Sequence, residues 1–225
     1  EETDQVFPVF YSYYDDHPFG SLTFVNNESN DITDVSVTVF IEQFMSNPDT
    51  SYTVDRIKRG ESFTAPLTAF LNENILNTMN ASETIAQVTV YYKSLGKKQE
   101  FTQPVALYTV SRNSMTWEDD RRAAAFVSGR DASAYTFAHR VKSIVQDNLV
   151  PSVPENIQYA AALYGALKAY GMNYVIDPTS AYSDNVGASS IDFLQFPYQT
   201  LMYRGGDCDD ISILVCSLFE AVSIN

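Results

Sequence analysis

Two glycines, an aspartate and a cysteine follow one another near the end of the chain, at Gly205, Gly206, Asp207 and Cys208. The residues after them predict a helix from about Cys208 to Ser223 that is apolar on nearly every side and therefore central in its domain. Glycines let a loop turn sharply, and the free N–H groups and the dipole at the start of a helix favour a thiolate. This spacing indicates that Cys208 is a nucleophile.

The charges around Cys208 oppose this activation. Asp207, Asp209 and Asp210 place three carboxylates beside the sulfur, and negative charges raise the pKa of a thiol. The helix dipole alone does not guarantee a thiolate at this position. A nucleophilic role therefore requires a basic partner.

The chain has two histidines and two cysteines. His17 precedes a proline in a turn, and His139 points away from the apolar face of its predicted helix, so we expect neither to serve as the base. Cys216 stands two turns beyond Cys208 on one helix, about 12 Å along the axis, which is too far for a disulfide. We expect Cys216 to be a buried free thiol that packs like a small hydrophobic residue.

The elements that must position these residues follow two patterns. Before residue 112, β-rich segments alternate with turns, and strands are expected at 19–25, 35–41, 52–57, 63–67, 84–92 and 100–108. After residue 113 the apolar spacing is helical, and helices are expected at 121–127, 131–148, 157–170 and about 208–223. Asn156 is expected to cap the third helix and Gly171 to end it. We therefore expect an α+β protein of two domains, a β-sandwich over 1–112 and a largely helical domain over 113–225.

The stretch 196–224 resembles the transglutaminase-like superfamily of papain-type thiol enzymes, because its Arg-Gly-Gly-Asp-Cys-Asp-Asp loop enters a central helix. The resemblance covers about 118–225 and implies amide hydrolysis or acyl transfer on a protein or peptide substrate. It makes Cys208 the nucleophile and the Cys208 backbone N–H an oxyanion donor. It also implies a histidine and an aspartate on strands after the cysteine helix. We expect these beyond Asn225, so that this chain alone is inactive.

Two further questions stay open within this resemblance. A side-chain oxyanion donor has three candidates, Gln195, Tyr198 and Gln199. The three aspartates beside Cys208 have three candidate roles: they complement the helix N-terminus, they support the nucleophile, or they bind calcium as in some bacterial relatives of that superfamily. We expect the first role, and therefore no metal or cofactor, with calcium at Asp207 and Asp209 as the alternative.

The first half of the chain resembles the immunoglobulin-like accessory modules of bacterial surface and periplasmic proteins. The likeness covers about residues 5–110 and depends on the strand 35–41 followed by the turn 57–62. It implies a binding or spacer role and an extracytoplasmic location. The first residues, Glu1-Glu2-Thr3-Asp4, do not form a signal peptide.

Composition and charge exclude several classes of protein. Hydrophobic residues make up 45% of the 225 and charged residues 19%, a balance typical of a globular chain. The net charge of −14 repels phosphate backbones, so no nucleic-acid partner is expected, and no apolar run reaches the roughly 20 residues of a membrane span. A non-catalytic binding protein and an assembly scaffold remain alternatives to the enzyme. We also expect self-association, because the strands that would cover the last helix in the resembled superfamily are expected beyond Asn225.

Overall fold

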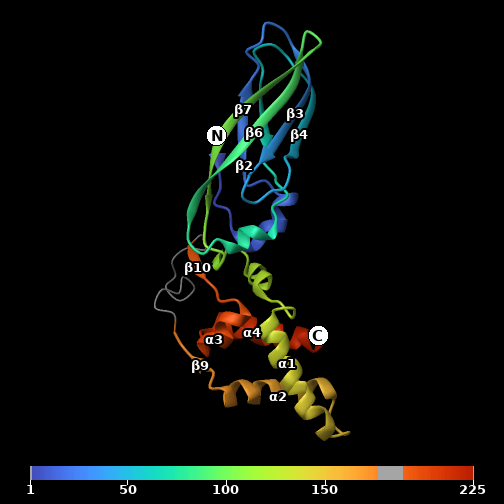
Figure 1. The fold of residues 1–225 in the computed structure, drawn as a ribbon, viewed down its shortest axis with the longest axis vertical. Helices are drawn as coiled ribbons and strands as arrows, with labels where there is room; N and C mark the ends of the chain where they lie inside the picture. The colour runs from blue at the N-terminus through green and yellow to red at the C-terminus, as the bar shows by residue number, and fades with distance from the viewer. Residues whose placement is uncertain (1, 177–189, 225) are drawn as a thin grey trace. The chain divides into compact units, whose positions relative to one another are not determined.

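The computed structural model of the protein describes residues 2–176 and 190–224 (Figure 1). The chain divides into two compact units, unit 1 (Glu1–Arg112) and unit 2 (Asn113–Asn225). Unit 1 is built mainly of strands and unit 2 mainly of helices, so the fold is α+β. In the described parts of the chain, every helix is too short or too polar to cross a membrane.

Unit 1 consists of two antiparallel sheets. One sheet has the order β1 (Glu2–Thr3), β2 (Gly20–Val25), β5 (Ser62–Pro66), and the other has the order β4 (Asp49–Ile57), β3 (Ile32–Phe40), β6 (Ser82–Ser94), β7 (Lys97–Thr109). Each of the six predicted strands coincides with one of β2 to β7, so these predictions are confirmed. Two 3-10 helices, η1 (Pro8–Asp15) and η2 (Glu73–Asn77), were not predicted.

The core of unit 1 explains why these segments become strands. Alternate residues of β3 are buried, and the register sets Val37 opposite Val90 and Val39 opposite Val88 of β6. Side chains of the other sheet, such as Leu22, belong to the same core cluster. A period of two in a sheet buries one face, and the apolar face of each sheet is covered by the other.

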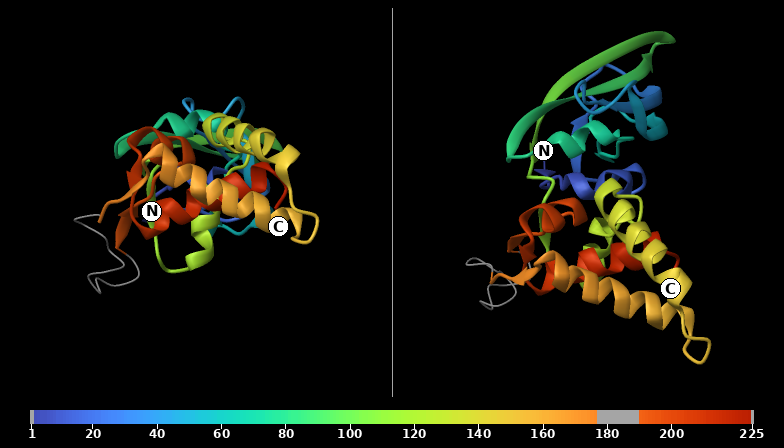
Figure 2. Two further views of the ribbon diagram at one scale, coloured as in Figure 1. Left: turned by 90° about the horizontal axis from the view of Figure 1, so that it is seen from below. Right: turned by 60° about the horizontal axis from the view of Figure 1, so that its bottom comes forward.

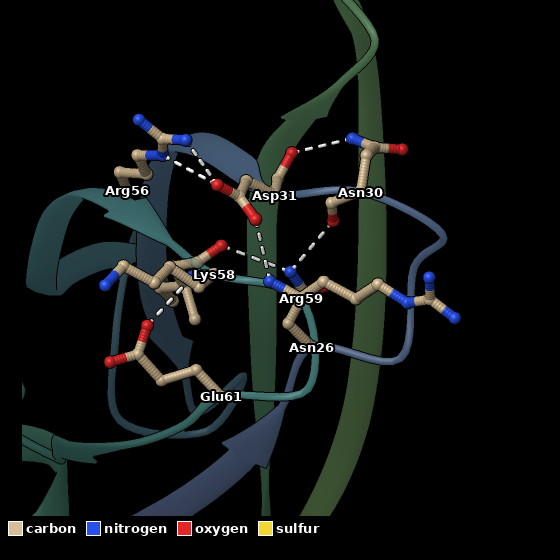
Figure 3. A network of polar contacts seen from close by, with 8 residues as sticks. Asn26, Asn30, Asp31, Arg56, Lys58, Arg59 and Glu61 are labelled. Atoms are coloured by element: carbon tan, nitrogen blue, oxygen red, sulfur yellow. Dashed lines mark hydrogen bonds and ion pairs between the residues drawn. The ribbon is translucent and has the colours of Figure 1, made fainter.

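Two turns meet at one end of unit 1 around the carboxylate of Asp31 (Figure 3). This carboxylate accepts a hydrogen bond of 2.9 Å from the backbone N–H of Arg59 and one of 2.9 Å from Nε of Arg56. These two contacts, the backbone hydrogen bond first, lower the pKa of Asp31. The backbone oxygen of Asn26 also accepts the N–H of Gly60, at 2.9 Å. The turn before β3 is thereby tied to the turn between β4 and β5.

Unit 2 packs helices around a small core, with short strands at its edges (Figure 2). Its elements are β8 (Ser114–Thr116), η3 (Asp120–Phe126), α1 (Ala132–Val145), η4 (Gln146–Asn148), α2 (Glu155–Tyr170), β9 (Asn173–Tyr174), β10 (Ile191–Phe193), α3 (Pro197–Tyr203), β11 (Gly205–Gly206) and α4 (Cys208–Ala221). Helix α4 packs mainly against α1 and α3. Leu214 and Leu218 of α4 are fully buried against Ala134 and Ala138 of α1.

The helical predictions are mostly confirmed, with differences at the ends. Gly171 ends α2 with a φ of 91°, the left-handed conformation that glycine adopts most easily. The prediction that Asn156 caps α2 is wrong, because α2 begins at Glu155 after Pro154 and has no side-chain cap. The segment predicted as a helix at 121–127 is the 3-10 helix η3. Helix α3 was not predicted, although Pro197 at its first position is a common start signal.

Candidate active site

The loop before Cys208 is held by a short parallel pairing of β11 with β9. Gly206 lies opposite Tyr174, and the backbone oxygen of Gly206 accepts the N–H of Val175 at 2.9 Å. A Cβ atom on Gly206 would lie 2.5 Å from Cβ of Asp210, which is closer than side-chain atoms approach. Glycine is therefore required at this position by close packing.

Asp207 starts helix α4. Its Oδ1 accepts the backbone N–H groups of Asp209, at 3.1 Å, and Asp210, at 3.3 Å. This is an N-cap, which satisfies two of the free N–H groups of the first turn. Cys208 is the first residue of the helix, and its thiol is exposed. The loop thus presents the sulfur to solvent at the positive end of the helix dipole.

The surroundings of Cys208 keep its thiol protonated at neutral pH. Burial of part of the group raises the pKa of Cys208, and the carboxylates of Asp209 and Asp207 raise it further. Sγ of Cys208 donates to Oδ1 of Asp209 across 3.4 Å. A hydrogen bond with the Tyr174 hydroxyl acts in the opposite direction and lowers the pKa of the thiol. Burial and the acidic neighbours together therefore outweigh the hydrogen bond from Tyr174, and the pKa of the thiol is raised.

The carboxylate of Asp210 is hydrogen-bonded to Gln195. Its Oδ1 accepts the backbone N–H of Gln195 and its Oδ2 accepts Nε2 of the same residue, both at 2.7 Å. The side chain is only 6% exposed, and this burial raises the pKa of Asp210 to about 6. Oε1 of Gln195 is buried and has no hydrogen-bond partner among the described residues.

The candidates for a side-chain oxyanion donor are placed as follows. The amide of Gln195 is committed to Asp210. Gln199 is buried, and its Oε1 accepts the backbone N–H of Phe196 and Nδ2 of Asn113, both at 2.8 Å. Tyr198 lines a different hollow, next to α1. Besides Asp209, the polar side chain that contacts the sulfur is that of Tyr174, which was not among the candidates from the sequence.

A fourth carboxylate belongs to this region and was missed at the level of sequence. Asp192 on β10 is buried, and its Oδ2 accepts Nε1 of Trp117 at 2.7 Å. Its charge contributes to raising the pKa of Asp209, after burial and the charge of Asp207. Strand β10 pairs with β8, a contact between segments about 75 residues apart that no local pattern predicts.

A hollow of about 280 Å³ opens beside the N-terminus of α4. Its apolar lining is formed by Val175, Ile176, Phe193 and Tyr203, and its polar lining by Gly205, Gly206, Asp207, Asp210 and Gln195. Arg204, which adjoins this lining in sequence, lies over the ring of Tyr170 at 4.7 Å. Among the described residues, the lining therefore contains two carboxylates and no basic side chain.

The predictions for the second cysteine and the last helix need correction. Cys216 is exposed, and with Ser212 and Glu220 it forms a stripe along α4 that faces away from the core. Helix α4 is thus not buried on every side among the described residues. The apolar composition misled the prediction because Ile211, Val215 and Phe219, beside this stripe, are only half-buried.

Neither histidine is brought to the thiol by its own unit. Nε2 of His139 lies 3.0 Å from the backbone oxygen of Ala221, at the opposite end of α4 from Cys208. A helix of 14 residues separates these ends by about 20 Å. The expectation that His139 is a solvent-facing residue is wrong, since the side chain is half-buried. His17 belongs to unit 1, where it stacks on Tyr13.

The ligand set for a metal ion is limited. One potential ligand atom each from Asp207, Cys208 and Asp209 lies within 4.8 Å of the other two. Calcium requires about six to eight oxygen ligands, whereas this group offers two carboxylates and a sulfur. The described side chains do not by themselves fit a calcium ion.

Comparison of the chain with models of known protein families gives no match, and comparison with curated proteins gives none either.

Proposed function

We propose that unit 2 carries the nucleophile of a transglutaminase-like thiol enzyme that acts on amide bonds of a protein or peptide. The observation that carries this proposal is the exposed thiol of Cys208 at the start of α4, one residue after Gly206, where an added Cβ would lie 2.5 Å from Cβ of Asp210. The hollow lined by Gly206, Asp207 and Asp210, which are neighbours of Cys208 in the sequence, offers room for a substrate side chain. The resemblance of the loop sequence to the thiol-enzyme superfamily supports the same assignment.

The reaction is a two-step acyl transfer. Sγ of Cys208 forms a bond to the amide carbon, the C–N bond breaks, and the amine leaves with a proton. Water or a second amine then attacks the thioester and restores the thiol. The negative oxygen formed in each step is stabilised by backbone N–H groups of the first helical turn, which have no acceptor within the helix. The N–H groups of Asp209 and Asp210 already donate to Asp207, so the N–H of Cys208 itself is the proposed donor.

A base is still needed, because the thiol is protonated at neutral pH and the described residues of unit 2 bring no histidine to it. We therefore expect residues 1–225 on their own not to cleave an unactivated amide. Full activity requires a histidine supplied from elsewhere. For unit 1 we propose an immunoglobulin-like binding or spacer module, supported by its two-sheet strand order. Such modules suggest an extracytoplasmic location.

An activated ester tests the nucleophile without a base in place. p-Nitrophenyl acetate needs only a thiolate, which forms an S–C bond to the acetyl carbon and releases nitrophenolate. We expect a burst of about one equivalent, followed by slow turnover, with the acetyl group on Cys208. Cys208→Ser should abolish the burst and Cys216→Ser should keep it. Acetylation confined to Cys216 would refute the proposal and favour the alternative of a non-catalytic binding protein.

A further inference from the structure

The hollow at the N-terminus of α4 has two chemically different sides. Exposed apolar side chains form the walls, with Phe193 at 51% exposed and Tyr203 at 60%. The carboxylates of Asp207 and Asp210 form part of the remaining lining. At about 280 Å³, the space lies just below the roughly 300–1,000 Å³ of sites for drug-sized ligands. It suits a single side chain better than a whole small molecule.

In the described part of the chain, two acceptor oxygens of the lining residues lack a hydrogen-bond donor. Oδ1 of Asp207 is used by the helix cap, whereas Oδ2 of Asp207 has no hydrogen-bond partner in the described part of the chain. Oε1 of Gln195 is a buried acceptor that likewise has no partner there. A buried acceptor without a donor costs free energy. An ammonium or guanidinium group supplies several donors and the opposite charge together.

We propose that this hollow binds the basic side chain, lysine or arginine, of a peptide segment whose neighbouring carbonyl is presented to Cys208. The aliphatic stem of such a side chain packs against Val175 and Ile176. Its charged head meets Asp207 and the rings of Phe193 and Tyr203, whose faces attract cations. The inference rests on the proposed function for its catalytic meaning, but the binding itself is independent of catalysis.

Protection of the thiol tests this binding without any enzymatic activity. The probe is Nα-acetyl-lysine amide, and the control is Nα-acetyl-norleucine amide, which has a similar stem and no charge. Each is added at millimolar concentration while iodoacetamide alkylates the folded protein, and labelling of Cys208 and Cys216 is followed by peptide mapping. We expect the lysine amide to slow alkylation of Cys208 at least threefold and to leave Cys216 unchanged. The norleucine amide should have a smaller effect.

Two variants test separately the charge of Asp207 and the apolar wall that includes Tyr203. Asp207→Asn keeps an oxygen for the helix cap and removes the charge, so it should abolish the preference for lysine over norleucine. Its matched control is Asp131→Asn at the cap of α1, which accepts from Ser133 and Ala134 in the same way. Tyr203→Ala should weaken protection by both amides, whereas Tyr164→Ala, at a 73% exposed position of α2, should not.

The outcomes distinguish this inference from the proposed function. Equal protection by lysine and norleucine amides, or equal protection of both cysteines, overturns the basic-side-chain site. If protection fails while p-nitrophenyl acetate still acylates Cys208, the site inference is wrong and the thiol-enzyme proposal stands. If protection is seen without acylation, the hollow binds basic side chains and the enzymatic proposal is wrong.

Discussion

The substitution Asp209→Asn should make the Cys208 thiol more reactive. Oδ1 of Asp209 lies 3.4 Å from Sγ of Cys208, and the carboxylate raises the pKa of the thiol. Asparagine keeps the size of the side chain and an oxygen that accepts the S–H, so only the negative charge is removed. The variant therefore isolates the electrostatic part of the interaction.

The size of the effect follows from this distance. Because the thiol is exposed, a water-like dielectric applies, and two unit charges 3.4 Å apart then interact by about 1 kcal/mol. This corresponds to roughly a fivefold larger thiolate population at neutral pH. A thiolate of lower pKa is also a weaker nucleophile, with a Brønsted coefficient of about 0.4–0.5. The net alkylation rate should therefore rise about two- to threefold.

The assay is iodoacetamide alkylation at pH 7, followed by peptide mapping over time. Cys216, on the same helix, serves as the internal reference, and Glu220→Gln serves as a matched control because it removes a charge from the far end of α4. Cys208 should be labelled faster in Asp209→Asn and unchanged in Glu220→Gln. An unchanged or slower rate at Cys208 in Asp209→Asn would refute the claim that the Asp209 carboxylate disfavours the thiolate of Cys208.

Three further outcomes are expected. The pKa of Asp210 is raised from 3.8 to about 6, so its ionisation destabilises the fold as pH rises through this window. The free energy of unfolding of Asp210→Asn should therefore rise relative to that of the unmodified protein between pH 4 and 7, by up to about 3 kcal/mol. Urea titrations in which the difference between the two proteins does not change with pH would contradict this. Gly206→Ala should lower the free energy of unfolding by about 1–3 kcal/mol. Gly165→Ala in α2, where an added Cβ meets nothing within 4 Å, should raise it by about 0.5–1 kcal/mol. Thermal melts that show both variants unchanged would count against the close packing at Gly206. Residues 1–112 expressed alone should melt cooperatively with β-type circular dichroism, because their core cluster lies within unit 1; a profile without near-UV signal would speak against an independent unit.

The sequence predicts the strands of unit 1 well because their burial is local and periodic. Val35, Val37 and Val39 all face the core, and a period of two needs no knowledge of distant residues. The helix starting at Cys208 was predictable for the same kind of reason, from an apolar run after a glycine turn. Short strands such as β8 and β10 were not, because they exist only through their pairing with each other.

The candidate site was predictable only in part. The nucleophile position follows from a contiguous motif, whereas Tyr174 reaches Cys208 through the parallel pairing of β9 with β11. That pairing depends on the three-dimensional path of the chain. The exposure of Cys216 was also beyond the sequence, since a helix with apolar residues on most sides gives no sign of which stripe its neighbours leave open.

Carbon-13 NMR of a bound peptide aldehyde tests the central claim most directly, because an aldehyde carbon labelled with carbon-13 changes its resonance when a thiol adds to it. The thiol adds across the C=O bond, with its proton transferred to the oxygen, to give a hemithioacetal. We expect the hemithioacetal resonance with the unmodified protein and with Cys216→Ser, and its loss with Cys208→Ser. A resonance that persists in Cys208→Ser and disappears in Cys216→Ser would contradict the assignment of Cys208 as the nucleophile.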